Sequence, residues 1–160
     1  HLHTIPDSGG DPMFASGYAA YEALSEPVKA LVSGLKAWNE SAHVHRDRFG
    51  DAGKLRDGDD SYPSSLHPIV RTHPVTGRKA LFVNENFTTR IESLNKNESD
   101  AILKMLYDHI ATPEFHCRFQ WREKSVAFWD NRCAQHRSVW DYFPQVRHGY
   151  RVTIAGDKPF

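Results

Sequence analysis

Three basic side chains in the last quarter of the sequence have types and spacing suited to holding small anions beside a metal ion. His136 follows a polar turn, and imidazole is the commonest ligand for a redox iron or for zinc. If residues 147–155 form a strand, Arg147 and Arg151 lie on one face with Gly149 between them. Guanidinium groups suit bidentate carboxylate or sulfonate binding, so this face could hold two separate anions. The residues alone leave two alternatives open, a surface histidine and an outward-facing polar strand side.

Other reactive side chains fit structural roles better. Cys117 is next to His116, but adjacent strand residues point to opposite faces, so we expect Cys117 to pack in the core rather than act as a nucleophile. Trp129 is likewise expected in the core. Asp130 and Asn131 are expected to shape the turn that presents His136.

Composition limits the classes of protein that the chain can belong to. Its 160 residues suit one compact domain, residues 1–160, and 39% hydrophobic residues can supply a packed core. Twenty basic residues balance twenty acidic ones, which argues against nucleic-acid binding through phosphate neutralisation. No apolar run is long enough to span a membrane, and the N-terminus has no signal-peptide profile. Two cysteines, both expected to be free thiols, favour a reducing compartment and hence a cytoplasmic protein.

The helical patterns lie in the first and middle parts of the chain. Ser16 predicts the start of a helix over residues 17–24, and Ser25-Glu26-Pro27 predicts the start of another with one apolar stripe. A third helix begins after Asn95 or Asn97 and ends before Pro113.

Strand patterns account for most of the remainder. Residues 2–5 can form a strand, residues 69–84 read as a hairpin with a glycine-containing loop, and residues 115–121, 126–129 and 147–155 are further strand candidates. The polar stretch 43–65 has no periodicity and is expected to be a mobile loop. A mainly β fold with helices, built as an antiparallel sandwich or barrel, follows from this order.

The motifs of the sequence resemble the taurine dioxygenase family of iron(II)- and 2-oxoglutarate-dependent oxygenases. The resemblance covers nearly the whole chain apart from residues 43–65. The matching segments are Ser8-Gly9-Gly10-Asp11, Ala20-Tyr21-Glu22-Ala23-Leu24-Ser25, Leu66 to Pro74, Gly77, Asn84 to Ile91, Trp129-Asp130-Asn131-Arg132, Gln135-His136, Asp141-Tyr142, Arg147, Arg151 and Gly156-Asp157-Lys158-Pro159.

The resemblance implies a double-stranded β-helix (jelly roll) that holds Fe(II) through a His-x-Asp/Glu…His triad. His136 matches the distal histidine of this triad, and Arg147 matches the arginine that pairs with the far carboxylate of 2-oxoglutarate. Arg151 and Phe87 match positions that contact the prime substrate. Such enzymes use dioxygen, convert 2-oxoglutarate to succinate and carbon dioxide, and hydroxylate a small anionic substrate, with ascorbate in a supporting role. For a sulfonate such as taurine, hydroxylation beside sulfur releases sulfite.

Two departures from the family pattern bear on these expectations. The His-x-Asp pair would lie upstream of residue 1, so we expect this chain to lack the N-terminal portion of the jelly roll. Pro12 replaces a threonine that commonly bonds 2-oxoglutarate, and proline has no hydroxyl to make that bond. The rival hypothesis is a jelly-roll module that binds a small acid through Arg147 and Arg151 without iron or catalysis. The sequence leaves the oligomeric state open, a homo-oligomer included.

Overall fold

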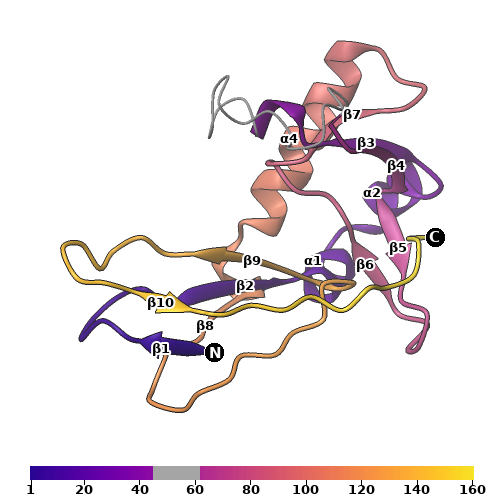
Figure 1. Cartoon of the computed structure of the whole chain (residues 1–160). Helices are drawn as coiled ribbons and strands as arrows, with labels where there is room; N and C mark the ends of the chain where they lie inside the picture. Colours follow the sequence, from indigo (N-terminus) through magenta and orange to yellow (C-terminus); the bar gives the residue numbers. More distant parts are fainter. Residues whose placement is uncertain (45–61) are drawn as a thin grey trace.

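The computed structural model describes residues 1–44 and 62–160, which form short strands and a few helices (Figure 1). The strands are β1 (Leu2–Thr4), β2 (Pro12–Ser16), β3 (Lys36–Glu40), β4 (Ser64–Pro68), β5 (Val70–Thr72), β6 (Lys79–Leu81), β7 (Thr88–Ile91), β8 (His116–Arg118), β9 (Ala134–Ser138) and β10 (His148–Gly149). The helices are α1 (Gly17–Glu22), α2 (Glu26–Val32) and α4 (Lys96–Ile110), followed by the short 3-10 helix η2 (Pro113–Phe115).

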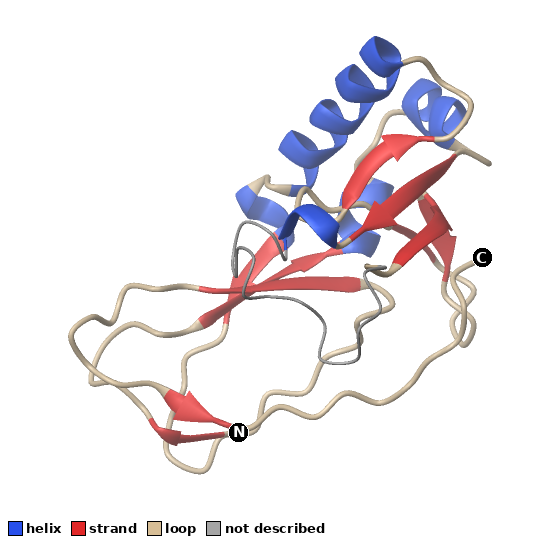
Figure 2. Ribbon diagram, turned by 45° about the horizontal axis from the view of Figure 1, so that its top comes forward, coloured by secondary structure: helices blue, strands red, loops and turns tan. Residues whose placement is uncertain are grey.

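The described strands pair antiparallel in four small sheets. Two sheets have three strands each, in the orders β8-β2-β9 and β4-β3-β7, and the pairs β1-β10 and β5-β6 complete the set. Figure 2 shows the helices gathered at one end of the molecule and long loops at the other. The β5-β6 pair is the hairpin that the sequence predicts over residues 69–84.

The three helices begin where the sequence predicts. Ser16 accepts a hydrogen bond from the Ala19 backbone N–H at the start of α1, and Pro27 lies in the first turn of α2. At α4, Asn95 rather than Asn97 is the N-cap, in a reciprocal capping box with Glu98. None of the helices in the described residues is both long and apolar enough to cross a membrane.

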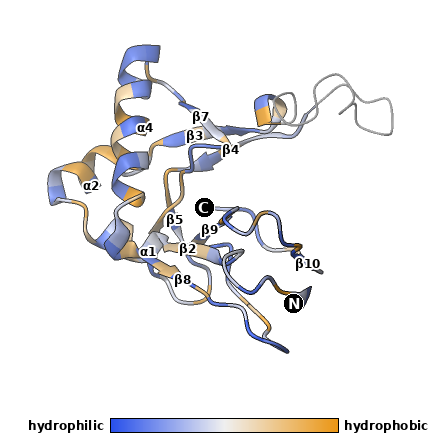
Figure 3. Ribbon diagram, turned by 90° about the vertical axis from the view of Figure 1, so that its left-hand side faces the viewer, coloured by the Kyte–Doolittle hydropathy of each residue, from blue (hydrophilic) through white to orange (hydrophobic). Residues whose placement is uncertain are grey.

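The core lies between the helices and the sheets on which they pack. Val32 of α2, Leu106 of α4 and Ile91 of β7 are at most 2% exposed, and they share one cluster with Ile69 and Leu81. Figure 3 shows α4 with hydrophobic and hydrophilic bands along its length, as expected when an amphipathic helix covers a core. Cys117, expected in the core, is instead an exposed free cysteine on β8.

Of the predicted strands, one forms only in part and another does not form. Within residues 147–155 only His148–Gly149 pairs, with β1, and the residues after Gly149 belong to no strand. The apolar run 126–129 is also outside any strand, and Phe128 is 87% exposed. In each case the pattern is suitable, but the described residues provide no neighbouring strand to pair with.

The predicted loop 43–65 falls mostly outside the described residues. Residues 45–61 are not described. His43 and Val44 are helical, and Ser64 and Ser65 already belong to β4, so the predicted loop is too long by two residues at each end.

Candidate active site

Strand β9 presents His136 and Ser138 on the same face. β9 pairs antiparallel with β2, so that Phe14 lies opposite His136 and Pro12 lies opposite Ser138. Residues two apart on a strand point to the same side, which makes this face a row of side chains from both strands. The sequence predicts His136 after a strand and a polar turn; in the structure it lies within β9, which follows the turn at residues 130–133.

Two aromatic rings flank the His136 imidazole. The Trp129 ring centroid is 4.8 Å from that of His136, and the Phe14 centroid is 6.2 Å away. Trp129, expected in the core, is instead half-buried and neighbours the candidate metal ligand. Partial desolvation, together with the nearby positive charge of Arg151, lowers the pKa of His136 below its ordinary value. A neutral imidazole is the form that binds a metal ion.

The two arginines reach this same face of β9, although not from the strand that the sequence predicts. Arg151 Nη1 lies 3.4 Å from His136 Nε2, and Arg147 Nη1 lies 3.4 Å from Ser138 Oγ. Because His136 and Ser138 are two residues apart on an extended strand, the two guanidinium contacts are separated by about 7 Å along it. The structure thus brings His136, Arg147 and Arg151 together.

Gly10 makes the space that the Arg147 side chain occupies. A Cβ at Gly10 would lie 3.0 Å from Arg147 Cδ and 3.2 Å from Tyr142 Cδ1, and the Gly10 φ of +70° favours glycine. Arg147 Nε is buried and has no hydrogen-bond partner. An arginine held with an unused donor is suited to receive an anion.

An ion-pair bridge fixes the turn that contains Gly10. The Arg118 guanidinium contacts Asp11 at 3.0 Å and Asp141 at 2.8 Å, and Asp141 also accepts a hydrogen bond from the Gly10 backbone N–H at 2.8 Å. These bonds hold the pKa of Asp141 below its ordinary value. The bridge joins the segment before β2 to the loop that leads to Arg147, and sequence spacing gave no signal for it.

Phe87 lies outside this group. It precedes β7, which belongs to the β4-β3-β7 sheet, and its side chain is 41% exposed. One link joins this region to the strand of His136, because the Gln135 side-chain amide donates a hydrogen bond to the Val83 carbonyl. Gln135 points to the face of β9 opposite His136.

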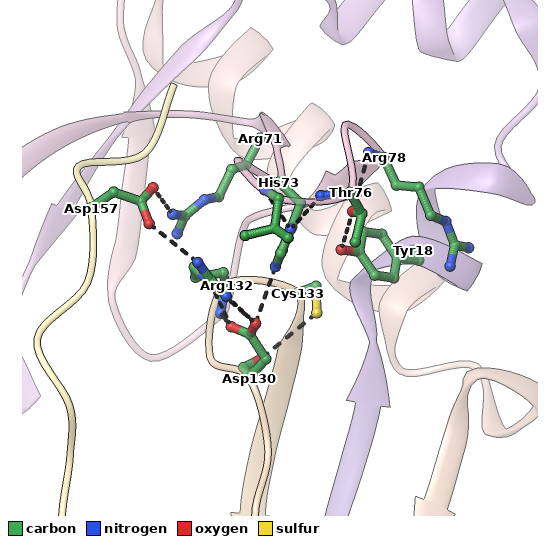
Figure 4. Close-up of polar contacts among 10 residues, drawn as sticks. Tyr18, Arg71, His73, Thr76, Arg78, Asp130, Arg132, Cys133 and Asp157 are labelled. Carbon is green, nitrogen blue, oxygen red and sulfur yellow. Dashed lines mark hydrogen bonds and ion pairs between the residues drawn. The ribbon is translucent and has the colours of Figure 1, made fainter.

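A second polar cluster lies just before β9 (Figure 4). Ligand atoms of His73, Asp130 and Cys133 lie within 4.8 Å of one another, close enough to consider a metal ion. However, His73 Nδ1 accepts the backbone N–H groups of Val75 and Thr76, so Nε2 carries the proton that is donated to Asp130. With that tautomer, His73 has no lone pair left for a metal, and the cluster is structural.

The residues around His136 fit part of an iron site. His136 Nε2 accepts only one long contact, 3.4 Å, from the exposed Arg151 side chain, and this lone pair would be released to a metal ion if Arg151 turned toward an anion. Among residues 1–44 and 62–160, the only group of three or more metal-ligating side chains is the His73 cluster, so His136 belongs to no such group there.

Comparisons with known proteins show which family the chain resembles. The model of the family "Taurine catabolism dioxygenase TauD, TfdA family" matches residues 1–153. A Schizosaccharomyces pombe protein named for alpha-ketoglutarate-dependent sulfonate dioxygenase activity is 47% identical over 98% of this chain and 40% of its own length. The alpha-ketoglutarate-dependent sulfate ester dioxygenase of Pseudomonas putida is 36% identical over 96% of this chain and 53% of its own.

A solved structure has a similar fold over nearly the whole chain. The crystal structure of a taurine dioxygenase from Burkholderia xenovorans matches 99% of this chain and 53% of that chain, with a TM-score of 0.84 and 36% identity. The predicted mainly β class with helices is thereby confirmed. The chain spans about half the length of the relatives that it matches. From the matched family model and from these relatives, we conclude that the chain belongs to the taurine catabolism dioxygenase TauD, TfdA family.

Proposed function

We propose that the natural protein containing this chain is an iron(II)- and 2-oxoglutarate-dependent dioxygenase that hydroxylates a small anionic substrate. The observation that carries the proposal is the row on β9, where a neutral imidazole and two guanidinium groups meet on one face. The bound iron and 2-oxoglutarate would supply the oxidation, in which dioxygen is consumed and 2-oxoglutarate becomes succinate and carbon dioxide. Residues 1–160 would form part of one jelly-roll catalytic domain.

Each residue of the row has a separate role in this proposal. His136 would be a metal ligand. Arg147 would pair with the far carboxylate of 2-oxoglutarate, because of the two arginines beside β9 it is the one with a buried donor left unused. Arg151, beside His136, would bind the anionic group of the prime substrate and so place the reacting carbon near the metal. Phe87 lies outside this row, before β7, and its proposed packing on the substrate rests on the family resemblance alone.

A sulfonate is the proposed class of substrate, with taurine as the first compound to test. Relatives are named for activity on sulfonates and on sulfate esters, whose anionic groups both suit an arginine. Hydroxylation of taurine beside sulfur would give a product that releases sulfite and an aldehyde. We also propose a cytoplasmic location, in line with the free thiols of Cys117 and Cys133.

The test uses the full natural polypeptide, reconstituted with Fe(II) under anaerobic conditions. We expect stoichiometric iron that is lost in His136→Ala, and succinate formation coupled to sulfite release when taurine and air are added. Succinate without sulfite would reject taurine and keep the enzyme class. A protein that binds no iron under any condition would instead be the non-catalytic acid-binding module.

The two arginines are distinguished by kinetics. Arg147→Ala should raise mainly the KM for 2-oxoglutarate, and Arg151→Ala mainly the KM for the prime substrate. Each lost charge-assisted contact is expected to cost about tenfold or more in the affected KM. If both variants impaired the same ligand to the same degree, the assignment of two separate anions would be wrong.

A further inference from the structure

The hydroxyl of Ser138 lies beside the guanidinium group of Arg147. Ser138 is half-buried on β9, and its Oγ lies 3.4 Å from Arg147 Nη1. That distance is long for a hydrogen bond, so the two groups are close enough to share a ligand without saturating each other. The backbone around Ser138 is already satisfied, since the Val139 N–H donates to the Asp11 carbonyl and the Phe119 N–H donates to the Pro12 carbonyl.

No acidic side chain in the described parts of the chain forms an ion pair with Arg147. Asp11 and Asp141, which lie beside the Gly9-Gly10 turn, are both bound by Arg118. Buried guanidinium donors without an acceptor are costly, and an incoming anion would relieve that cost. Arg147 and Ser138 therefore form a small positive site with one unused hydroxyl proton.

The residue opposite Ser138 on β2 has no hydroxyl of its own, so at this cross-strand position only β9 supplies one. Pro12 is buried and pairs with Ser138 across the β2–β9 ladder, so both side chains lie on the same face. Proline offers neither a hydroxyl nor a backbone N–H. Within this cross-strand pair, Ser138 is the one member that can donate a hydrogen bond.

We propose that Ser138 donates a hydrogen bond to the same carboxylate that Arg147 pairs with, so that guanidinium and hydroxyl together hold the far end of 2-oxoglutarate. The Arg147 Nη1–H donates to Ser138 Oγ, and the hydroxyl proton is directed to the carboxylate. This arrangement orders both groups before the ligand arrives. The inference rests on the proposed function, because it takes 2-oxoglutarate as the ligand of Arg147.

The experiment measures 2-oxoglutarate binding to the full natural protein, loaded with Fe(II) under anaerobic conditions, by calorimetry. Ser138→Ala should weaken binding by about tenfold, the typical effect of one hydrogen bond to a charged group. Ser65→Ala, an exposed serine on β4, is the matched control and should leave the affinity within twofold. 2-Oxobutyrate, which lacks the far carboxylate, should bind Ser138→Ala and the unaltered protein equally.

A rescue variant separates a ligand contact from a folding effect. Pro12→Thr places a hydroxyl directly across from position 138, so the double variant Pro12→Thr/Ser138→Ala should recover most of the lost affinity. If Ser138→Ala binds 2-oxoglutarate normally while Arg147→Ala does not, the role of Ser138 is wrong and the proposed function stands. If Arg147→Ala also binds normally, the proposed function itself fails.

Discussion

At the scale of single residues, the site depends on two glycines, which have no Cβ, as much as on its charged side chains. Gly9 and Gly10 both have positive φ angles, and a Cβ on either would meet the loop that carries Asp141 and Arg147. The Ser8-Gly9-Gly10-Asp11 motif reads in sequence only as a turn. Its effect on Arg147 arises because the loop that carries Arg147 packs against Gly10, and a local sequence pattern does not predict a contact between such distant segments.

Gly10→Ala should therefore damage 2-oxoglutarate binding more than it damages the fold. The new methyl group would press on Arg147 Cδ at 3.0 Å, and the positive φ would cost about 1–2 kcal/mol in backbone strain. Gly77→Ala is the matched control, because Gly77 has a φ of +68° with nothing within 4 Å of its Cβ position. Both variants should lose similar thermal stability, but only Gly10→Ala should raise the KM for 2-oxoglutarate several-fold. Equal KM values in the two variants would contradict the role given to Gly10.

Asp130 links stability to pH through the cluster before β9. Hydrogen bonds from Arg132 and then from His73 hold the pKa of Asp130 well below its usual range. Because the pKa is lower in the folded state, this stabilisation is present above the unfolded pKa near 4 and is lost as the pH falls through the folded value.

Asp130→Asn should accordingly lower the urea midpoint at pH 7 and reduce its further loss between pH 5 and pH 3. Asp108→Asn is the control, since its ion pair with Lys104 is exposed and should contribute little. A midpoint at pH 7 that is unchanged in Asp130→Asn would show that the cluster does not stabilise the fold.

At the scale of elements, local signals predicted the helices well and the strands less well. A helix is encoded within its own residues, as the Asn95 cap and the Pro113 stop of α4 illustrate. β2 was missed because Pro12-Met13-Phe14-Ala15-Ser16 has no clear alternation and directly joins a helix cap. For residues 147–155 the prediction was wrong in the opposite sense. The alternation of polar and apolar residues is clear and predicts a strand, but Val152 is 90% exposed and has no partner strand among the described residues. Strand pairing is decided by distant segments, which a local pattern does not contain.

The capping box of α4 gives a direct test at this scale. Asn95→Ala removes the acceptor for the Glu98 backbone N–H and should cost about 1 kcal/mol of unfolding free energy. Asn97→Ala, inside the first turn of the same helix, should cost less, because alanine favours helix and Asn97 is not the cap. Equal losses would show that the capping box has no influence on stability. Denaturant unfolding monitored by circular dichroism distinguishes the two variants.

At the scale of the whole molecule, the candidate site joins segments that are distant in sequence. Arg151 lies on a stretch without regular structure that leaves β10 and runs to the C-terminus beside β5 (Figure 1). Residue types and the family motifs identified His136, Arg147 and Arg151. They could not identify Ser138, Gly10 or the Arg118 bridge, whose contacts arise only when β2, β8 and β9 align.

Asp157 is the anchor of that C-terminal stretch. It pairs with the buried Arg71 at 2.6 Å and with Arg132 at 3.6 Å (Figure 4), and three residues later the Phe160 carbonyl accepts the Thr72 N–H. These contacts fix the far end of the segment whose near end places Arg151 beside His136. The position of Arg151 therefore depends on an ion pair six residues away in sequence.

Asp157→Ala should weaken binding of the prime substrate without weakening that of 2-oxoglutarate. Loss of the anchor frees residues 152–160 and lets Arg151 move, whereas Arg147 keeps its place beside Gly10 and its contact with Ser138. We expect a several-fold higher KM for the prime substrate, faster proteolysis within residues 152–160, and lower thermal stability because buried Arg71 loses its partner. Lys158→Ala, at the exposed neighbouring position, is the control and should change none of these quantities. If both KM values rose together in Asp157→Ala, the two arginines would not be positioned independently, and the separation of the two anion sites would have to be abandoned.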